Sequence, residues 1–129
     1  MRIAHVALWT HDLDRCAQFY VTYFGAVAGG RYENKAKGFE SRFLSFDGGA
    51  RLEIMKTTVL PLPPAEAGAQ RMGLTHIAIS VDSEEKVDAM AQRLRDDGHD
   101  IIDGPRRTGD GYYECVTLDP DGNRVEITA

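Results

Sequence analysis

The chain has 129 residues, a net charge of −5 and a composition that is 43% hydrophobic and 27% charged. This length and balance are typical of one globular domain and exclude disorder, collagen and coiled coil. The acidic balance provides no basic field, so we expect neither nucleic acid nor a membrane as a partner. No apolar run approaches the roughly 18–20 residues that span a bilayer, and the N-terminus does not resemble a signal peptide, which together predict a cytoplasmic protein.

The chain begins with a short β-rich run that has a histidine inside it, Ile3-Ala-His-Val-Ala-Leu8. Behind Asp12, apolar residues recur at helical spacing from Leu13 to Phe24, and Gly25 stands where a helix end favours glycine. These patterns predict a strand and then a helix with Asp12 as its N-cap.

Further strands are expected after the helix. We predict a strand around Val27 to Tyr32, followed by a polar loop from Glu33 to Gly38. Residues 42–46 and 51–55 then read as two strands of a hairpin around a Gly48-Gly49 turn.

The second half repeats this order. His76 lies inside Leu-Thr-His-Ile-Ala-Ile, at an offset of 76 − 5 = 71 from the first histidine. A second helical pattern follows Asp82, with Glu85 completing a capping box and Gly98 as the end signal.

The two halves also end alike. Tyr112 to Leu118 and Arg124 to Thr128 read as a hairpin around Asp119-Pro-Asp-Gly, and Glu126 follows Glu53 by 126 − 53 = 73 residues. We therefore predict an α+β protein of two βαβββ modules. The modules are expected at about residues 1–60 and 71–129, with a proline-rich linker at about 61–70.

Each predicted module supplies one histidine and one glutamate: His5 with Glu53, and His76 with Glu126. Strand alternation puts the apolar neighbours of each glutamate on the opposite face, where a helix would cover them. Imidazole and carboxylate ligands suit zinc, nickel, cobalt or iron, and leave positions open for water or substrate. The duplication predicts one shared site for a divalent ion.

The sequence resembles the vicinal oxygen chelate superfamily over essentially its whole length. That resemblance implies paired βαβββ modules with curved mixed sheets, and a homodimer. It also implies that one divalent ion is bound by four ligands: His5, Glu53, His76 and Glu126. Manganese is a further candidate for this ion. The motifs that carry it are His5-Val-Ala-Leu, Asp12-Leu-Asp-Arg-Cys-Ala-Gln-Phe-Tyr, Glu53, Gly73-Leu-Thr-His-Ile-Ala-Ile-Ser-Val, Asp119-Pro-Asp-Gly and Glu126.

Within the superfamily, the ligand pattern most resembles glyoxalase I. Extradiol dioxygenases and fosfomycin-resistance enzymes use three ligands, and methylmalonyl-CoA epimerase usually has glutamine at the first-module position, so Glu53 is the discriminating residue. The resemblance implies a metal-dependent lyase or isomerase that acts on a small vicinal-oxygen substrate through an enediolate. The alternatives are a metal-dependent epimerase or dioxygenase, or a drug-binding protein of the same fold.

The chemistry of that class requires a carboxylate base. A divalent ion that binds two neighbouring oxygens acidifies the adjacent C–H, and a glutamate then takes the proton. Glu126 is the favoured base, and Glu53 can share the role.

Three further residues are candidates for substrate binding. If the glycine turn pairs the residues that flank it, Arg42 lies opposite Met55 and Leu44 opposite Glu53, all on one face. Arg42 would then bind an anionic substrate group, while Trp9 and Met55 line an apolar pocket. Trp9 and Thr57 also stand where glyoxalase I often has arginine and asparagine for glutathione, which implies a substrate other than the usual glutathione hemithioacetal.

Overall fold

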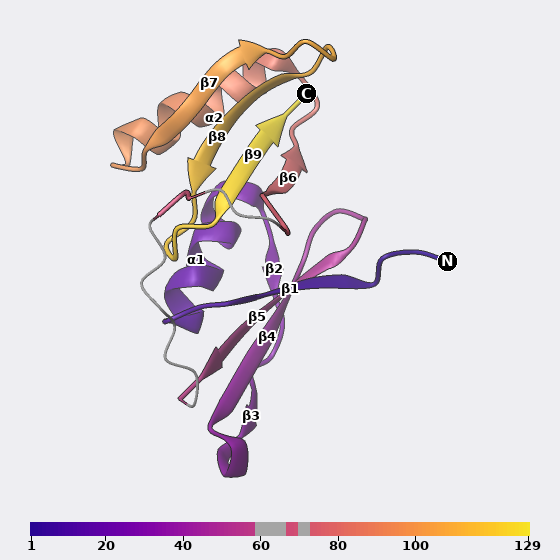
Figure 1. The fold of residues 1–129 in the computed structure, drawn as a ribbon, viewed down its shortest axis with the longest axis vertical. Helices are drawn as coiled ribbons and strands as arrows, with labels where there is room; N and C mark the ends of the chain where they lie inside the picture. Colours follow the sequence, from indigo (N-terminus) through magenta and orange to yellow (C-terminus); the bar gives the residue numbers. More distant parts are fainter. Residues whose placement is uncertain (59–66, 70–72) are drawn as a thin grey trace. The chain divides into compact units, whose positions relative to one another are not determined.

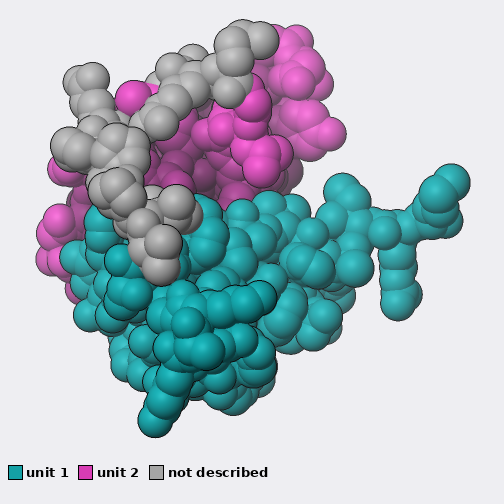
Figure 2. All heavy atoms as spheres, turned by 60° about the horizontal axis from the view of Figure 1, so that its bottom comes forward, with its two compact units in different colours: residues 1–64 teal, residues 65–129 magenta. Residues whose placement is uncertain are grey.

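The structure of the protein is a computed structural model that describes residues 1–58, 67–69 and 73–129. It divides into two compact units, Met1–Pro64 (unit 1) and Ala65–Ala129 (unit 2), coloured separately in Figure 2. In the described residues, each unit holds one sheet and one α-helix, so the predicted α+β class is confirmed. Most of the predicted linker at residues 61–70 lies outside the described residues. No helix in the described ranges is long and apolar enough to cross a membrane.

Unit 1 is a mixed sheet with α1 packed on one face (Figure 1). The strands run in the order β1-β5-β4-β2, with β3 also paired to β4, and β1 is parallel to β5. A short 3₁₀ turn, Lys35–Lys37, connects β3 to β4. The elements are β1 (His5–Trp9), α1 (Leu13–Phe24), β2 (Val27–Ala28), β3 (Tyr32–Asn34), β4 (Phe39–Ser45) and β5 (Arg51–Thr57).

The segment after α1 differs from the prediction of one strand from Val27 to Tyr32. It forms two short strands, β2 and β3, each paired with β4. Gly29 and Gly30 separate them, and glycine pairs weaken a strand interior because they supply no side chain to pack. Glu33 and Asn34, expected in a loop, belong to β3.

The ends of α1 are those that the sequence predicts. The Asp12 carboxylate accepts hydrogen bonds from the backbone N–H groups of Asp14 and Arg15, both at 3.0 Å. Gly25 ends the helix with a φ of 64°, a left-handed conformation that glycine adopts without steric cost. Five residues of the helix are buried: Leu13, Cys16, Ala17, Phe19 and Tyr20.

Unit 2 is a four-stranded mixed sheet with α2 packed on β7 and β8 (Figure 1). The strand order is β6-β9-β8-β7, and β6 is parallel to β9. This is a βαβββ module, as predicted. Its elements are β6 (Ile77–Ser80), α2 (Glu84–Asp96), β7 (Ile101–Arg107), β8 (Tyr113–Leu118) and β9 (Arg124–Thr128).

The N-cap of α2 is Ser83, so the predicted cap at Asp82 with a Glu85 capping box is wrong by one residue. The Ser83 hydroxyl accepts the backbone N–H of Lys86 at 3.3 Å. Asp82 has a φ of 60° and Ser83 donates its N–H to Val81 at 2.7 Å, which makes a tight turn. Ser83 is therefore the residue with the extended backbone that an N-cap requires.

The predicted register of the β4–β5 hairpin is also wrong by one residue. Phe43 lies opposite Glu53, and Arg42 lies opposite Ile54. The connection is the whole loop of residues 46–50, instead of a turn of the two glycines alone. A shift of one residue exchanges the two faces of a strand. The prediction that Arg42 shares the Glu53 face is therefore wrong.

Burial explains why this register is the stable one. Leu44 and Leu52 lie opposite each other. These two residues and Ile54 lie on the face that α1 covers, and each is at most 3% exposed. In the predicted register, Leu44 would leave this core and lie beside a carboxylate. Keeping a leucine buried is worth on the order of 1.5–3 kcal/mol.

Candidate metal site

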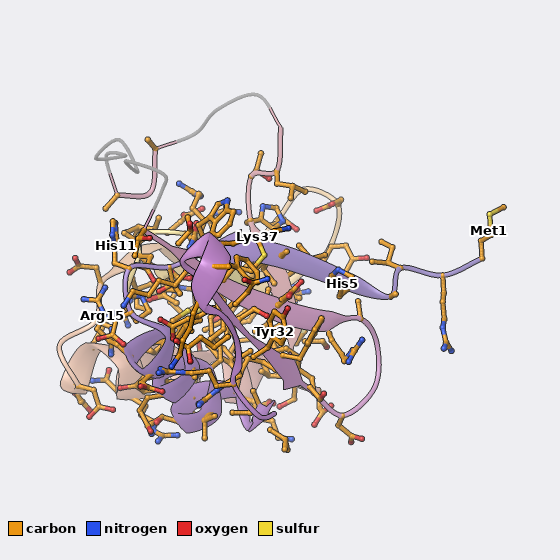
Figure 3. The ribbon with its side chains drawn as sticks, turned by 90° about the horizontal axis from the view of Figure 1, so that it is seen from below. Met1, His5, His11, Arg15, Tyr32 and Lys37 are labelled. Carbon is orange, nitrogen blue, oxygen red and sulfur yellow. The ribbon has the colours of Figure 1, made fainter. Side chains whose placement is uncertain are left out.

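Unit 1 brings His5 and Glu53 together on the face of the sheet that α1 does not cover. In the parallel β1–β5 pair, His5 lies opposite Arg51 and Ala7 opposite Glu53, so alternation puts both side chains on one face. His5 Nε2 is 3.8 Å from Glu53 Oε2. His5 lies on the β1 ribbon in Figure 3, and the N-terminal Met1 extends away from it. The glutamate side chain is only 17% exposed.

Unit 2 makes the equivalent pair. His76 directly precedes β6, Ala78 lies opposite Glu126, and His76 Nε2 is 3.5 Å from Glu126 Oε2. The Glu126 side chain is 17% exposed, the same fraction as Glu53. The Thr75 hydroxyl lies 3.0 Å from His76 Nδ1. A partner on one ring nitrogen orients the imidazole and leaves the other nitrogen available to a metal.

Each pair fits two ligands of one divalent ion. Imidazole and carboxylate atoms that are both about 2.1 Å from an ion are separated by roughly 3.0–3.4 Å in octahedral or tetrahedral geometry. The two observed separations are slightly wider, at 3.8 and 3.5 Å, and side-chain rotation can close that difference. Within residues 1–58, 67–69 and 73–129, no group of three or more His, Cys, Asp or Glu side chains forms a metal site. The four-ligand set therefore stays a prediction.

An aromatic side chain supports the unit 1 pair. The Phe43 ring, opposite Glu53, makes an edge contact with His5 at a centroid distance of 5.4 Å. The guanidinium carbon of Arg51 lies 4.1 Å from the centroid of the same ring. Sequence reasoning missed Phe43 because it used the wrong hairpin register; requiring Leu44 in the core would have found it.

Trp9 and Met55 lie opposite each other, and the register puts both on the face that carries Glu53. The Trp9 ring also makes an edge contact with Phe39. Their predicted role in substrate binding remains a prediction. Arg42, in contrast, faces the helix side, where its Nη1 lies 3.5 Å from an Asp14 carboxylate oxygen.

A second carboxylate, Glu114, shares the Glu126 face in unit 2, because Val116 lies opposite Glu126 and Glu114 lies two residues before it. Its side chain is 12% exposed. Burial and the negative charge of Glu126 raise the pKa of Glu114, and Arg106 partly offsets this. Arg106 is held by a two-point ion pair with Asp103, which lowers the pKa of that carboxyl. The alternation of the predicted second hairpin could have identified Glu114.

Comparison with known proteins supports the resemblance. The protein YqjT of Bacillus subtilis (strain 168) is 27% identical over 128 residues, which cover 97% of this chain and 96% of YqjT. A glyoxalase family protein from Enterococcus faecalis matches in structure with a TM-score of 0.78 and 25% identity, covering 99% of this chain and 97% of that one.

Glyoxalase I from Zea mays has the same TM-score of 0.78 at 23% identity, and the match covers 98% of this chain. It covers 44% of the maize chain, so the present chain spans less than half of that enzyme. The profile of the Glyoxalase/Bleomycin resistance protein/Dioxygenase superfamily matches residues 2–127. As the motifs predicted, the chain belongs to this superfamily.

Proposed function

We propose that this protein is a metal-dependent lyase or isomerase of the glyoxalase I type that acts on a small vicinal-oxygen substrate. The observation that carries the proposal is the duplicated pair: His5 with Glu53 at 3.8 Å, and His76 with Glu126 at 3.5 Å. A single His–Glu pair is common on protein surfaces. Two such pairs at equivalent positions of the two modules indicate a common function. One divalent ion per chain, bound by all four side chains, would account for both pairs.

The residues divide the chemistry between them. When bound, the ion supplies Lewis-acid polarisation of two neighbouring substrate oxygens. His5 and His76 would hold the ion through their imidazole nitrogens. A carboxylate oxygen of Glu126 takes the proton from the adjacent substrate carbon and returns it to the neighbouring carbon, with Glu53 as the alternative base.

The test begins with metal. Protein purified without added metal and then offered nickel, zinc, cobalt, manganese or iron should bind about one ion per chain. His76→Ala should weaken binding strongly, since it removes one of four ligands, whereas the matched variant His11→Ala should not, because exposed His11 lies outside both pairs. A wild-type chain that stays metal-free, or a His76→Ala variant that binds as tightly as wild type, would overturn the ligand set.

A substrate screen on the metal-loaded chain then separates the enzyme classes. Isomerisation of 2-oxoaldehyde thiol adducts supports the proposal. Oxygen consumption with bound iron indicates a dioxygenase, and proton exchange with racemisation alone indicates an epimerase. Tight binding of a drug-like molecule by metal-free protein, with no turnover, indicates a binding protein of the same fold.

A further inference from the structure

The sequence places an arginine two residues before each of the paired glutamates, in Arg51-Leu-Glu53 and Arg124-Val-Glu126. Strand alternation puts each arginine on the same face as its glutamate. The two arginines are therefore equivalent in the two modules. Their surroundings, however, differ.

Arg124 has a structural role. It is half-buried, and its Nη1 donates a hydrogen bond to the backbone oxygen of Gly68 at 3.1 Å. That contact ties β9 to the chain segment that precedes the module. A cation with such a contact is already engaged.

Arg51 is exposed, and its guanidinium lies over the Phe43 ring, 4.1 Å from the centroid. A guanidinium carries five N–H donors, and an aromatic face attracts the cation without accepting those donors in ordinary hydrogen bonds. Among the described residues, no carboxylate or carbonyl oxygen contacts the Arg51 guanidinium. Arg31 and Arg42 in the same unit are instead paired with Asp14.

The position of Arg51 relates it to the candidate metal pair. It lies opposite His5 in the β1–β5 register, and Phe43 contacts both of these side chains. Its Cα is about 6.6 Å along the strand from that of Glu53, by the rise of two strand residues. A substrate held through two neighbouring oxygens can bridge this distance with a group a few bonds away.

The charge near the proposed metal site indicates which kind of substrate group Arg51 would bind. Two glutamates balance the charge of a divalent ion. The Arg51 guanidinium adds a positive charge that no carboxylate among the described residues pairs with. We infer that Arg51, held on the Phe43 ring, binds a carboxylate of the substrate. This inference rests on the proposed function. The substrate class is thus a small vicinal-oxygen compound that also carries a carboxylate.

The test uses the full chain loaded with Co²⁺ and two probes that share one chelating head, acetohydroxamate and succinohydroxamate. Only the second carries a carboxylate beyond the head. Binding of each is followed through the visible spectrum of the cobalt. Wild-type protein should bind succinohydroxamate about ten- to a hundred-fold more tightly, the range for one charge-assisted hydrogen bond.

Variants assign the preference to one side chain. Arg51→Met should abolish it without changing the affinity for acetohydroxamate. Arg51→Lys should keep part of it, because lysine retains the charge but not the planar fork, and this variant decides the matter if Arg51→Met folds poorly. Arg31→Met is the matched control: it removes the same charge from an ion pair with Asp14 and Glu40, and should keep the full preference.

Two results would overturn the inference in distinguishable ways. Equal wild-type affinity for both probes, or equal losses in Arg51→Met and Arg31→Met, would reject the role of Arg51 while the cobalt response still supports the proposed metal site. A chain that takes up no cobalt and binds neither probe would reject the proposed function, and this inference with it.

Discussion

Glu126 combines burial with a position beside His76, and these two features suit a carboxylate that both binds a metal and moves a proton. Glu126→Gln should preserve the fold and much of the metal affinity, since the amide oxygen can still ligate. It should lower turnover by on the order of 10²-fold or more, because an amide cannot accept the proton. Steady-state kinetics on metal-loaded protein measures this. Turnover within about threefold of wild type would move the base role to Glu53.

Trp9 and Thr57 bear on the thiol part of the substrate. Where the resemblance implies arginine and asparagine for glutathione, this chain offers an indole and a hydroxyl. Loss of one charge-assisted hydrogen bond, worth roughly 1.5–3 kcal/mol, lowers affinity about ten- to a hundred-fold. We therefore expect the glutathione–methylglyoxal adduct to be a poor substrate. A kcat/KM of about 10⁶ M⁻¹s⁻¹ or above in a steady-state assay would contradict this and indicate an ordinary glyoxalase I.

At the scale of elements, the β4–β5 register makes opposite predictions for two neighbouring residues. Leu44 is fully buried against α1, so Leu44→Ala should destabilise the fold by about 2–5 kcal/mol through the cavity it leaves. Phe43 is half-buried on the other face, so Phe43→Ala should cost less stability but weaken metal binding, because it removes the ring that contacts His5. Denaturant unfolding and metal titration of both variants check this. The reverse assignment of effects would contradict the register.

The same hairpin shows what sequence reasoning could reach. The duplication of His5 and Glu53 in His76 and Glu126 predicted both pairs, since a β-strand period of two residues fixes which neighbours are buried. The Asp12 cap was predictable for a similar reason: its hydrogen bonds are made within one helical turn.

The failures arose where local signals compete with tertiary packing. Gly48 and Gly49 both have positive φ, which suits a tight turn, yet the loop of residues 46–50 is longer because Leu44 and Leu52 must both reach the core. At α2, Asp82 and Ser83 are both good caps, and only the turn at Val81 selects the serine. A residue-by-residue pattern contains neither constraint.

At the scale of the whole molecule, two of the exposed apolar side chains, Val27 and Ile102, lie on edge strands. Val27 on β2 is 70% exposed and Ile102 on β7 is 40% exposed, and each of these strands ends the sheet of its unit. Unpaired edges with apolar side chains favour association. We predict a homodimer with metal bound, measurable by sedimentation velocity at micromolar concentration. A stable metal-bound monomer would contradict this prediction, and Val27→Lys is expected to weaken the dimer if β2 takes part.

The proposed ion also predicts how stability is distributed through the chain. An ion that takes ligands from both units stabilises both at once, whereas an ion bound by one pair stabilises only the unit that holds it. At a free metal concentration of about 100 Kd the gain is roughly 2.7 kcal/mol. Saturating metal should therefore slow amide hydrogen exchange in β5 of unit 1 and in β9 of unit 2 to a similar degree.

His76→Ala makes this prediction sharp, because the substitution lies in unit 2 alone. With the shared site it should abolish the metal-induced protection in both β5 and β9, while His11→Ala, outside both pairs, should leave it intact. Metal-induced protection of β5 that survives His76→Ala would mean that His5 and Glu53 bind an ion without the second module. The two pairs would then be separate weak sites, and the four-ligand centre would have to be abandoned.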